Sequence, residues 1–437
     1  MTTETIALPV YALLFALSVA AGLRAPRYGI VFLIALAPFA FYFGLGATTL
    51  TLSKAALVGV GAGLLLRPIP WPIFRSVSFV RLSLAGTLLV LTTAFSIVHA
   101  QFADAAIRET LKACEYLLLF AVVYAAHRVD PSPRTLRVTI ALTVLGVALT
   151  ALFQEWHGAP SRLLIDGHTI PRIAGTLEGP NQLAGYLGVA VPLLAALNVD
   201  RFERLTALTL AIASAALVLT FSRAGILSTI LAVAVVLIVS NQRTRATAAT
   251  FVAGLALGLG GIVYWALATG SLAVLGFWGV ETANPGSVGT HSQLWRAAMM
   301  LWRRHPLYGV GAGNFELALP SIGLQAVRTH ANSLYLQNLA EQGLPGIAAT
   351  LLLIWQSIAS FIRDARTSPF VLGALAASLG LAVHQIVDLI VFYPKVGAWW
   401  WIVMAIGAAE LRHFHKYRIS PAARVARRDV DSSETAT

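Results

Sequence analysis

Cysteine is almost absent from this sequence, since Cys114 is the single one among 437 residues. One thiol cannot form an intrachain disulfide, and Cys114 is expected to be a packing residue. No grouping of residues has the ligand spacing of a structural metal site. Charged residues are also scarce, at 11% of the chain. A soluble domain of this length would need a more polar surface, which excludes the soluble classes.

The sequence contains many long apolar runs. Hydrophobic residues make up 57% of the chain, and the mean hydropathy is +0.76. Runs of about the length that crosses a bilayer occupy residues 6–23, 28–46, 50–66, 82–100, 109–126, 138–156, 180–198, 206–221, 224–240, 247–268, 346–362, 370–391 and 396–411. The sequence therefore predicts an all-α integral membrane protein, a polytopic bundle of about 12 or 13 transmembrane helices. Glu4 stands where a signal peptide would be basic, so the first run is expected to remain as a helix.

The net charge of +12 is concentrated in arginine clusters on alternate loops, which implies no nucleic-acid module. Under the positive-inside rule these loops and the C-terminus face the cytoplasm, and the long interruptions 157–179 and 269–345 face outward. The chain is thereby divided into N-terminal transmembrane helices (1–268), an outer loop region with amphipathic helices (269–345), C-terminal transmembrane helices (346–411) and a polar tail (412–437) that we expect to be disordered.

Two outer-face arginines are candidates for binding an anionic head group. Arg223 lies in the segment TFSRAG at 220–225, where small neighbours allow close approach of a ligand. Arg172 is followed by a glycine-containing segment that leads to Asn181 beside Pro180. A guanidinium suits phosphate oxygens because it is a planar fork of donors. The alternatives are an interfacial anchor for Arg223 and a helix-capping side chain for Asn181.

The outer region 269–345 contains a predicted amphipathic helix from Leu294 to Arg304, on which Arg296 stands among tryptophan and methionine residues. The glycine-rich segment HPLYGVGAGNF at 305–315 follows it. This segment lacks the Gly-Lys-Ser/Thr ending of a phosphate loop and no strand precedes it, so we predict no nucleotide site. Within the run 370–391, His384 and Asp388 are four residues apart in a predicted helix and could form a proton relay or a structural polar pair.

A polar stretch, RTHANSLYLQNLAEQGLPG at 328–346, precedes a membrane helix. His330 is interpreted either as a base or phosphate contact at the membrane surface, or as a surface residue that caps the next helix. Imidazole titrates near neutral pH, which suits proton transfer. Asn332 and Tyr335 in the same stretch are candidate substrate contacts.

Three of these segments in order, FSRAG at 221–225, HPLYGVGAGNF at 305–315 and the stretch 330–346, resemble the signature blocks of the O-antigen ligase and polymerase superfamily. The resemblance implies transfer of a glycan from undecaprenyl diphosphate, without nucleotide or metal cofactor, at the periplasmic face of the bacterial inner membrane. It implies that Arg223 and Arg172 bind diphosphate, that Arg296 supports them, and that His330 acts on the acceptor hydroxyl. The family motif is often written as His, then Asn, Ser or Gln, then nine residues and Gly. Counting back from Gly343 places Asn332 and Ser333 at the first two positions, so His330 lies two residues before the expected position.

Among members of this superfamily, the sequence is most similar to the ligases, which use the lipid A core oligosaccharide as acceptor and are expected to invert the anomeric carbon. An O-antigen polymerase, which extends a second lipid-linked glycan, and a protein O-oligosaccharyltransferase are alternatives. A transporter is an alternative of another class, because many helices and the pair of His384 and Asp388 would suit proton coupling. The long outer segment argues against it.

Overall fold

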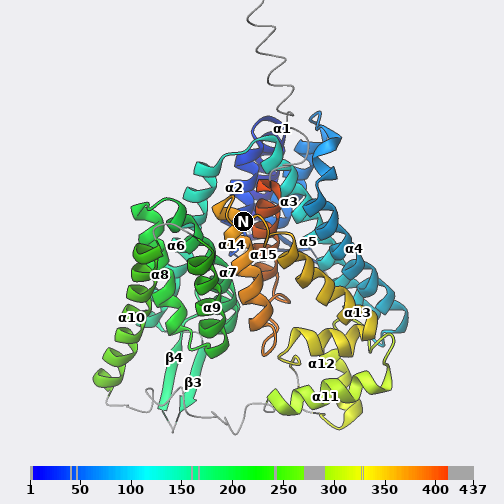
Figure 1. The fold of residues 1–437 in the computed structure, drawn as a ribbon. Helices are drawn as coiled ribbons and strands as arrows, with labels where there is room; N and C mark the ends of the chain where they lie inside the picture. The colour runs from blue at the N-terminus through cyan, green and yellow to red at the C-terminus, as the bar shows by residue number, and fades with distance from the viewer. Residues whose placement is uncertain are drawn as a thin grey trace, which may run out of the picture.

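The computed structural model describes residues 3–411, apart from 40–41, 46–47, 159–160, 166–167, 241–243, 270–290, 326 and 328. Within these residues the chain is a helical bundle with two small hairpins (Figure 1). Six of the described helices are long and apolar enough to cross a membrane, and shorter apolar helices accompany them. The prediction of an all-α polytopic membrane protein is confirmed. The predicted tail 412–437, and with it the side of the C-terminus, lies outside the described residues.

The N-terminal elements are α1 (Thr3–Arg24), α2 (Pro26–Leu36), β1 (Tyr42–Leu45), β2 (Thr48–Thr51), α3 (Leu52–Leu65), η1 (Trp71–Arg75), α4 (Val77–Ser96), η2 (Ile97–His99), α5 (Ala103–Val129) and α6 (Pro133–His157). The remaining ones are β3 (Ser161–Ile165), β4 (His168–Arg172), α7 (Pro180–Asp200), α8 (Arg204–Leu219), α9 (Arg223–Val239), α10 (Thr244–Thr269), α11 (His291–Arg304), α12 (Phe315–Ala318), η4 (Leu319–Ile322), α13 (Leu334–Ala359), α14 (Pro369–His384) and α15 (Pro394–Glu410).

Three predicted apolar runs have different boundaries in the structure. The run 28–46 is helical only to Leu36, and its end is strand β1, which pairs antiparallel with β2. The run 370–391 ends as a helix at His384, so Asp388 lies in the turn that follows. The helix expected from residue 346 begins at Leu334 and is broken at Gly343, where φ is 64° and ψ is −157°.

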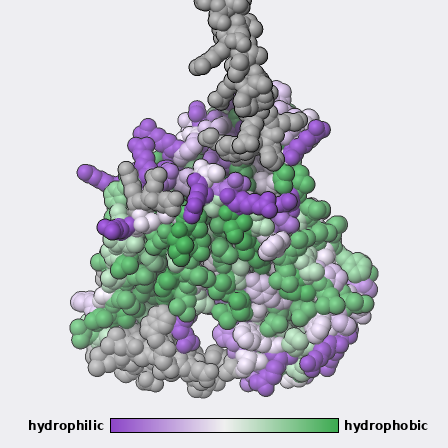
Figure 2. Space-filling view, in the orientation of Figure 1, coloured by the Kyte–Doolittle hydropathy of each residue, from purple (hydrophilic) through white to green (hydrophobic). Residues whose placement is uncertain are grey.

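Helix α7 forms the centre of the bundle. Of its most apolar window, 94% is buried inside the protein, because α8, α9, α14 and α15 all contact it. Small residues permit this packing: a Cβ on Gly185 would lie 1.9 Å from Ile390 Cγ2. Figure 2 shows a hydrophobic belt around the middle of the molecule, with hydrophilic side chains gathered above and below it. Such a belt is what a bilayer requires of a protein that crosses it.

A separate layer, called here the outer layer, is made of α11, α12, η4 and the start of α13 and lies at the lower right of Figure 1. The helix predicted at 294–304 is present and begins at His291. Its apolar face, formed by Leu294, Ala297, Ala298 and Leu301, is buried at helical spacing. The last three belong to a small core with Phe315 and Leu319. The sequence predicted that this face lies at the membrane interface. In the structure it contacts protein.

The glycine-rich segment 305–314 is bound to α13 at its break. Backbone N–H groups of Val310 and Gly311 donate to the carbonyls of Ala340 and Glu341 at 2.9 and 2.8 Å, and Leu344 N donates to Pro306 O at 3.0 Å. A Cβ on Gly309 would lie 2.2 Å from the carbonyl carbon of Glu341. The glycines at 309 and 311 are thus needed for close backbone contact.

Replacing Gly309 with alanine should destabilise the outer layer, because the new methyl group would clash with the backbone and because φ is +67°. We expect the free energy of unfolding to fall by about 2–4 kcal/mol, measured by thermal unfolding in detergent. Gly323→Ala is the matched control, because φ is +89° there and nothing lies within 4 Å of the added Cβ. That change should cost only about 1 kcal/mol. Equal losses in both variants would show that close contact at Gly309 does not matter.

Candidate functional site

The candidate site surrounds the turn 385–393 between α14 and α15. The backbone N–H of Leu334 donates to the carbonyls of Gln385 and Asp388 at 3.0 and 3.1 Å, which ties the start of α13 to this turn. Because Gly185 contacts Ile390, the outer part of α7 lies against the same turn. Segments from β4, α7, α9, α11 and α13 therefore converge here. Figure 2 shows an opening near the lower end of the bundle, with hydrophilic side chains on its margin.

Arg172 is held by a polar network. Its Nη2 donates to Asn181 Oδ1 at 2.7 Å and its Nε to Thr220 O at 2.8 Å. Asn181 in turn hydrogen-bonds the carboxylate of Asp388. Asn181 is therefore not the capping residue that the sequence allowed, since Gly179 occupies the N-cap of α7 without a side-chain cap. The network fixes a guanidinium at the end of β4.

Burial governs the charges in this network. It lowers the pKa of Arg172 to about 10, with Asp388 opposing the shift. Burial also raises the pKa of Asp388 to about 6, against the hydrogen bonds from Leu389 N and Asn181 and the charge of Arg172. Arg172 thus stays cationic at neutral pH. His384 Nε2 lies 3.7 Å from Asp388 Oδ2, so the two side chains are neighbours without a hydrogen bond between them, and the two residues do not share a helix.

Arg223 is the first residue of α9, and its side chain is exposed. The preceding turn presents it: Phe221 has φ of 53°, and Ser222 caps the helix by accepting from Gly225 N at 3.3 Å. The sequence predicted a turn rich in small residues, and the structure has one. The guanidinium is therefore accessible from solvent at this end of the bundle.

His291, which the sequence analysis did not single out, is a neighbour of Arg223. Burial lowers the pKa of His291, the charge of Arg223 lowers it further, and a hydrogen bond to the backbone of Val387 opposes both. Its ring centroid is 6.5 Å from that of Trp295, whose Nε1 donates to Asn332 O at 3.4 Å. A histidine one turn before a tryptophan at the start of an amphipathic helix was the available signal.

Arg296 has a different environment. It is exposed on α11, and its Nε donates to Ser292 O of the same helix at 3.2 Å. The structure therefore brings His291 next to Arg223 and leaves Arg296 on the outer surface of the layer.

His330 lies against the turn 385–393. Its ring centroid is 4.5 Å from that of Phe392 and 6.3 Å from that of Tyr393. Lys112 Nζ lies 3.8 Å from the Phe392 ring centroid and is paired with Glu109 at 2.6 Å. Burial lowers the pKa of His330, with opposing contributions from Glu316 and Glu109. The ring is thus neutral at pH 7, and its buried Nδ1 has no hydrogen-bond partner among the described residues.

The residues after His330 form the start of α13. Ser333 is the N-cap and accepts from Leu336 N at 3.5 Å, so neither His330 nor Asn332 caps the helix. Asn332 has φ of 49°, which places it at a tight bend. The hydroxyl of Tyr335 donates to Ala382 O at 2.7 Å. Tyr335 therefore contacts α14 through its hydroxyl and could face a ligand only with its ring.

An apolar cavity of about 110 Å³ lies next to His330. Lys112 and Phe392 belong to its wall, and the other apolar residues that line it include Leu89, Leu353, Ile354, Trp400 and Trp401. Its polar side includes Gln337, which accepts from Ala331 N at 2.8 Å and donates to Glu341 at 2.7 Å. The cavity is thus mainly apolar, with Glu109, Lys112 and Glu341 among the residues that line it.

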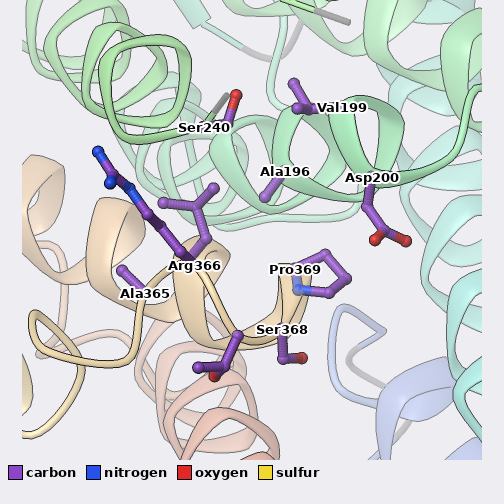
Figure 3. A pocket seen from close by; sticks show the side chains of 10 residues that line it. Ala196, Val199, Asp200, Ser240, Ala365, Arg366, Ser368 and Pro369 are labelled. Carbon is purple, nitrogen blue, oxygen red and sulfur yellow. The ribbon is translucent and has the colours of Figure 1, made fainter. Parts of the chain in front are cut away.

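A second cavity, of about 240 Å³, lies at the opposite ends of the helices (Figure 3). Asp200 and Arg366 are on its wall, but Asp200 pairs with Arg137 and Arg366 Nε donates to Val239 O at 2.9 Å. Helix α9, 17 residues long, separates this cavity from Arg223 by about 25 Å. It is therefore not part of the site. Among the described residues no group of three or more His, Cys, Asp or Glu residues could hold a metal ion.

The fold and the site define a polytopic membrane protein with cationic and imidazole groups at one end of its bundle. A family model described as O-Antigen ligase matches residues 208–351, and this match supports membership of the O-antigen ligase/polymerase superfamily. It supports a ligase-type or polymerase-type function in lipopolysaccharide biosynthesis, with lipid-linked glycans as substrates. A search of the curated proteins finds no match.

Proposed function

We propose that the chain is an O-antigen ligase, which transfers a glycan from undecaprenyl diphosphate to the lipid A core oligosaccharide at the periplasmic face of the bacterial inner membrane. The observation that carries this proposal is the convergence of Arg172, Arg223, His291 and His330 around the turn 385–393. Two guanidinium groups and an imidazole suit a diphosphate, and the neutral His330 suits an acceptor hydroxyl.

The reaction needs a leaving group that is stabilised and an acceptor that loses a proton. Arg223 and Arg172 neutralise the diphosphate as the glycosidic bond breaks, with His291 beside Arg223. His330 takes the proton of the acceptor hydroxyl, which attacks the anomeric carbon from the opposite side and inverts it. Asp388 positions Arg172 through Asn181. The apolar cavity beside Lys112 suits the first part of a polyprenyl chain.

One experiment separates the candidate functions. The purified chain is incubated with an undecaprenyl-diphosphate glycan and, in separate reactions, with lipid A core, with a second donor, or with a pilin-like protein. Transfer to the core supports the ligase. Extension of the second donor would instead identify a polymerase, and a glycosylated protein would identify an oligosaccharyltransferase. If no transfer occurs while vesicles containing the chain move the lipid-linked glycan across the bilayer, the chain is a transporter.

Chelation should not affect the rate, because arginines take the place of a metal ion in this mechanism. We expect turnover in EDTA to equal turnover without it, in the same reaction with lipid A core. A matched sample with added magnesium serves as the control. Activity that disappears in EDTA and returns with magnesium or manganese would overturn the assignment of charge neutralisation to Arg172 and Arg223.

A further inference from the structure

A third cavity, of about 240 Å³, opens in the outer layer at the end of α11. Its wall is formed by the end of α11, by η2, by the segment 305–310, and by α12 with η4, and the polar or aromatic residues on it include His99, Gln101, Arg304, His305, Tyr308 and Asn314. Helix α11 has 14 residues, so this cavity lies about 20 Å from His291 at the other end. It is therefore separate from the site around the turn 385–393.

One wall of this cavity is a stack of rings. His99 and Tyr308 are stacked with ring centroids 4.2 Å apart and planes at 27°. His305 lies 5.5 Å from Tyr308 on the same wall. His99 is exposed, and Tyr308 and His305 are partly exposed, so ring surface is accessible from the cavity. Flat rings with polar edges suit a ligand that has one apolar face and polar groups at its margin.

The remaining wall is polar and cationic. Arg304 Nη1 donates to Ser321 O at 3.1 Å, which holds the guanidinium beside the cavity. Asn314 is committed to the protein, since it exchanges hydrogen bonds of 2.9 and 3.2 Å with the backbone of Phe102. No acidic side chain is among the described residues that line the cavity. A ligand with a negative group is therefore favoured over a cationic one.

We propose that this cavity binds an acidic sugar residue of a glycan. The C–H face of a pyranose ring packs on the wall formed by His99 and Tyr308, its hydroxyls meet Gln101 and His305, and its acidic group pairs with Arg304. The inference rests on the proposed function, which supplies two glycans to this face of the protein. A subsite at the end of α11 that is farthest from His291 would hold a sugar other than the one whose bond breaks.

The test measures binding without transfer. Saturation-transfer NMR on the full chain in nanodiscs, with methyl glucuronide and methyl glucoside as probes, should give signals from the ring protons of both, with tighter binding of the glucuronide. Tyr308→Ala should abolish both signals. Arg304→Gln should weaken the glucuronide at least tenfold and leave the glucoside unchanged. Arg303→Gln, a neighbouring exposed arginine outside the cavity wall, is the matched control and should bind like the unmodified chain.

Steady-state kinetics decide whether the bound sugar belongs to the acceptor or to the donor glycan. If the subsite takes the acceptor, Arg304→Gln should raise KM for lipid A core at least tenfold and leave KM for the donor and kcat unchanged; if it takes the donor glycan, the donor KM should rise instead. Absence of probe binding in the unmodified chain, or equal binding in the Arg304→Gln and Arg303→Gln variants, overturns the subsite even if transfer occurs. Probe binding without any glycan transfer would leave the cavity assigned and overturn the ligase function.

Discussion

Arg223→Ala is expected to lower turnover by about 10²–10³-fold, because a charge-assisted contact to the departing diphosphate is lost. The side chain is exposed at the first position of α9 and Ser222 caps that helix, so the variant should fold normally. Initial rates with undecaprenyl-diphosphate glycan and lipid A core measure the effect. Arg303→Ala, which removes another exposed outer-layer arginine, is the control and should retain its rate.

The variant Arg223→Lys separates the contribution of two parallel guanidinium hydrogen bonds from the contribution of positive charge alone. One ammonium group cannot donate two parallel hydrogen bonds, so Arg223→Lys should also be impaired, by about tenfold or more. A rate close to that of the unmodified chain would leave only a requirement for positive charge. A rate unaffected even by alanine would remove Arg223 from the site and favour its interpretation as a membrane anchor.

His330→Ala should lower kcat by about 10²–10⁴-fold and leave affinity for undecaprenyl diphosphate nearly unchanged, because proton transfer contributes in the transition state and not to donor binding. The ring lies between the start of α13 and Phe392, and no hydrogen bond from its buried Nδ1 to the described residues would be lost. Single-turnover rates and a titration with the lipid diphosphate measure the two effects separately. Loss of diphosphate binding would instead make His330 an electrostatic partner of Arg223.

The pH profile provides a second measure of His330. A base must be neutral, and burial lowers the pKa of this ring below its ordinary value of 6.5. The rate should therefore stay level near pH 7 and fall only as the pH drops through the lowered pKa. This acid limb should disappear in His330→Ala. Asp388, whose pKa is raised to about 6, is another group that titrates in this range, and Asp388→Asn should keep the limb due to His330.

Asn332→Ala tests the other position that the motif count allowed. Asn332 occupies a bend with positive φ, and its carbonyl accepts from Trp295. Alanine keeps that carbonyl, so we expect a milder loss than for His330→Ala, about tenfold at most. If Asn332→Ala lowers kcat more than His330→Ala does, Asn332 and not His330 is the residue that acts on the acceptor.

Sequence patterns selected some of the residues that form the candidate site. They selected Arg172, Arg223 and His330, which the structure brings to one turn, and they selected Arg296, which it leaves exposed on α11. They missed His291, because it lies outside the three motif segments and its place one turn before Trp295 at the start of an amphipathic helix was not used. They also assigned Asn181 to helix capping, whereas its side chain connects Arg172 with Asp388.

The sequence by itself determined that this chain is a helical membrane protein, because runs of apolar residues without charge must satisfy their backbone hydrogen bonds locally in a bilayer. It also determined which segments interrupt the bundle. Only the tertiary structure decided which polar groups meet. Arg172 and Asp388 are more than 200 residues apart, and their connection through Asn181 follows from how β4, α7 and the turn 385–393 pack together. Such long-range contacts depend on side-chain packing, which no local pattern encodes.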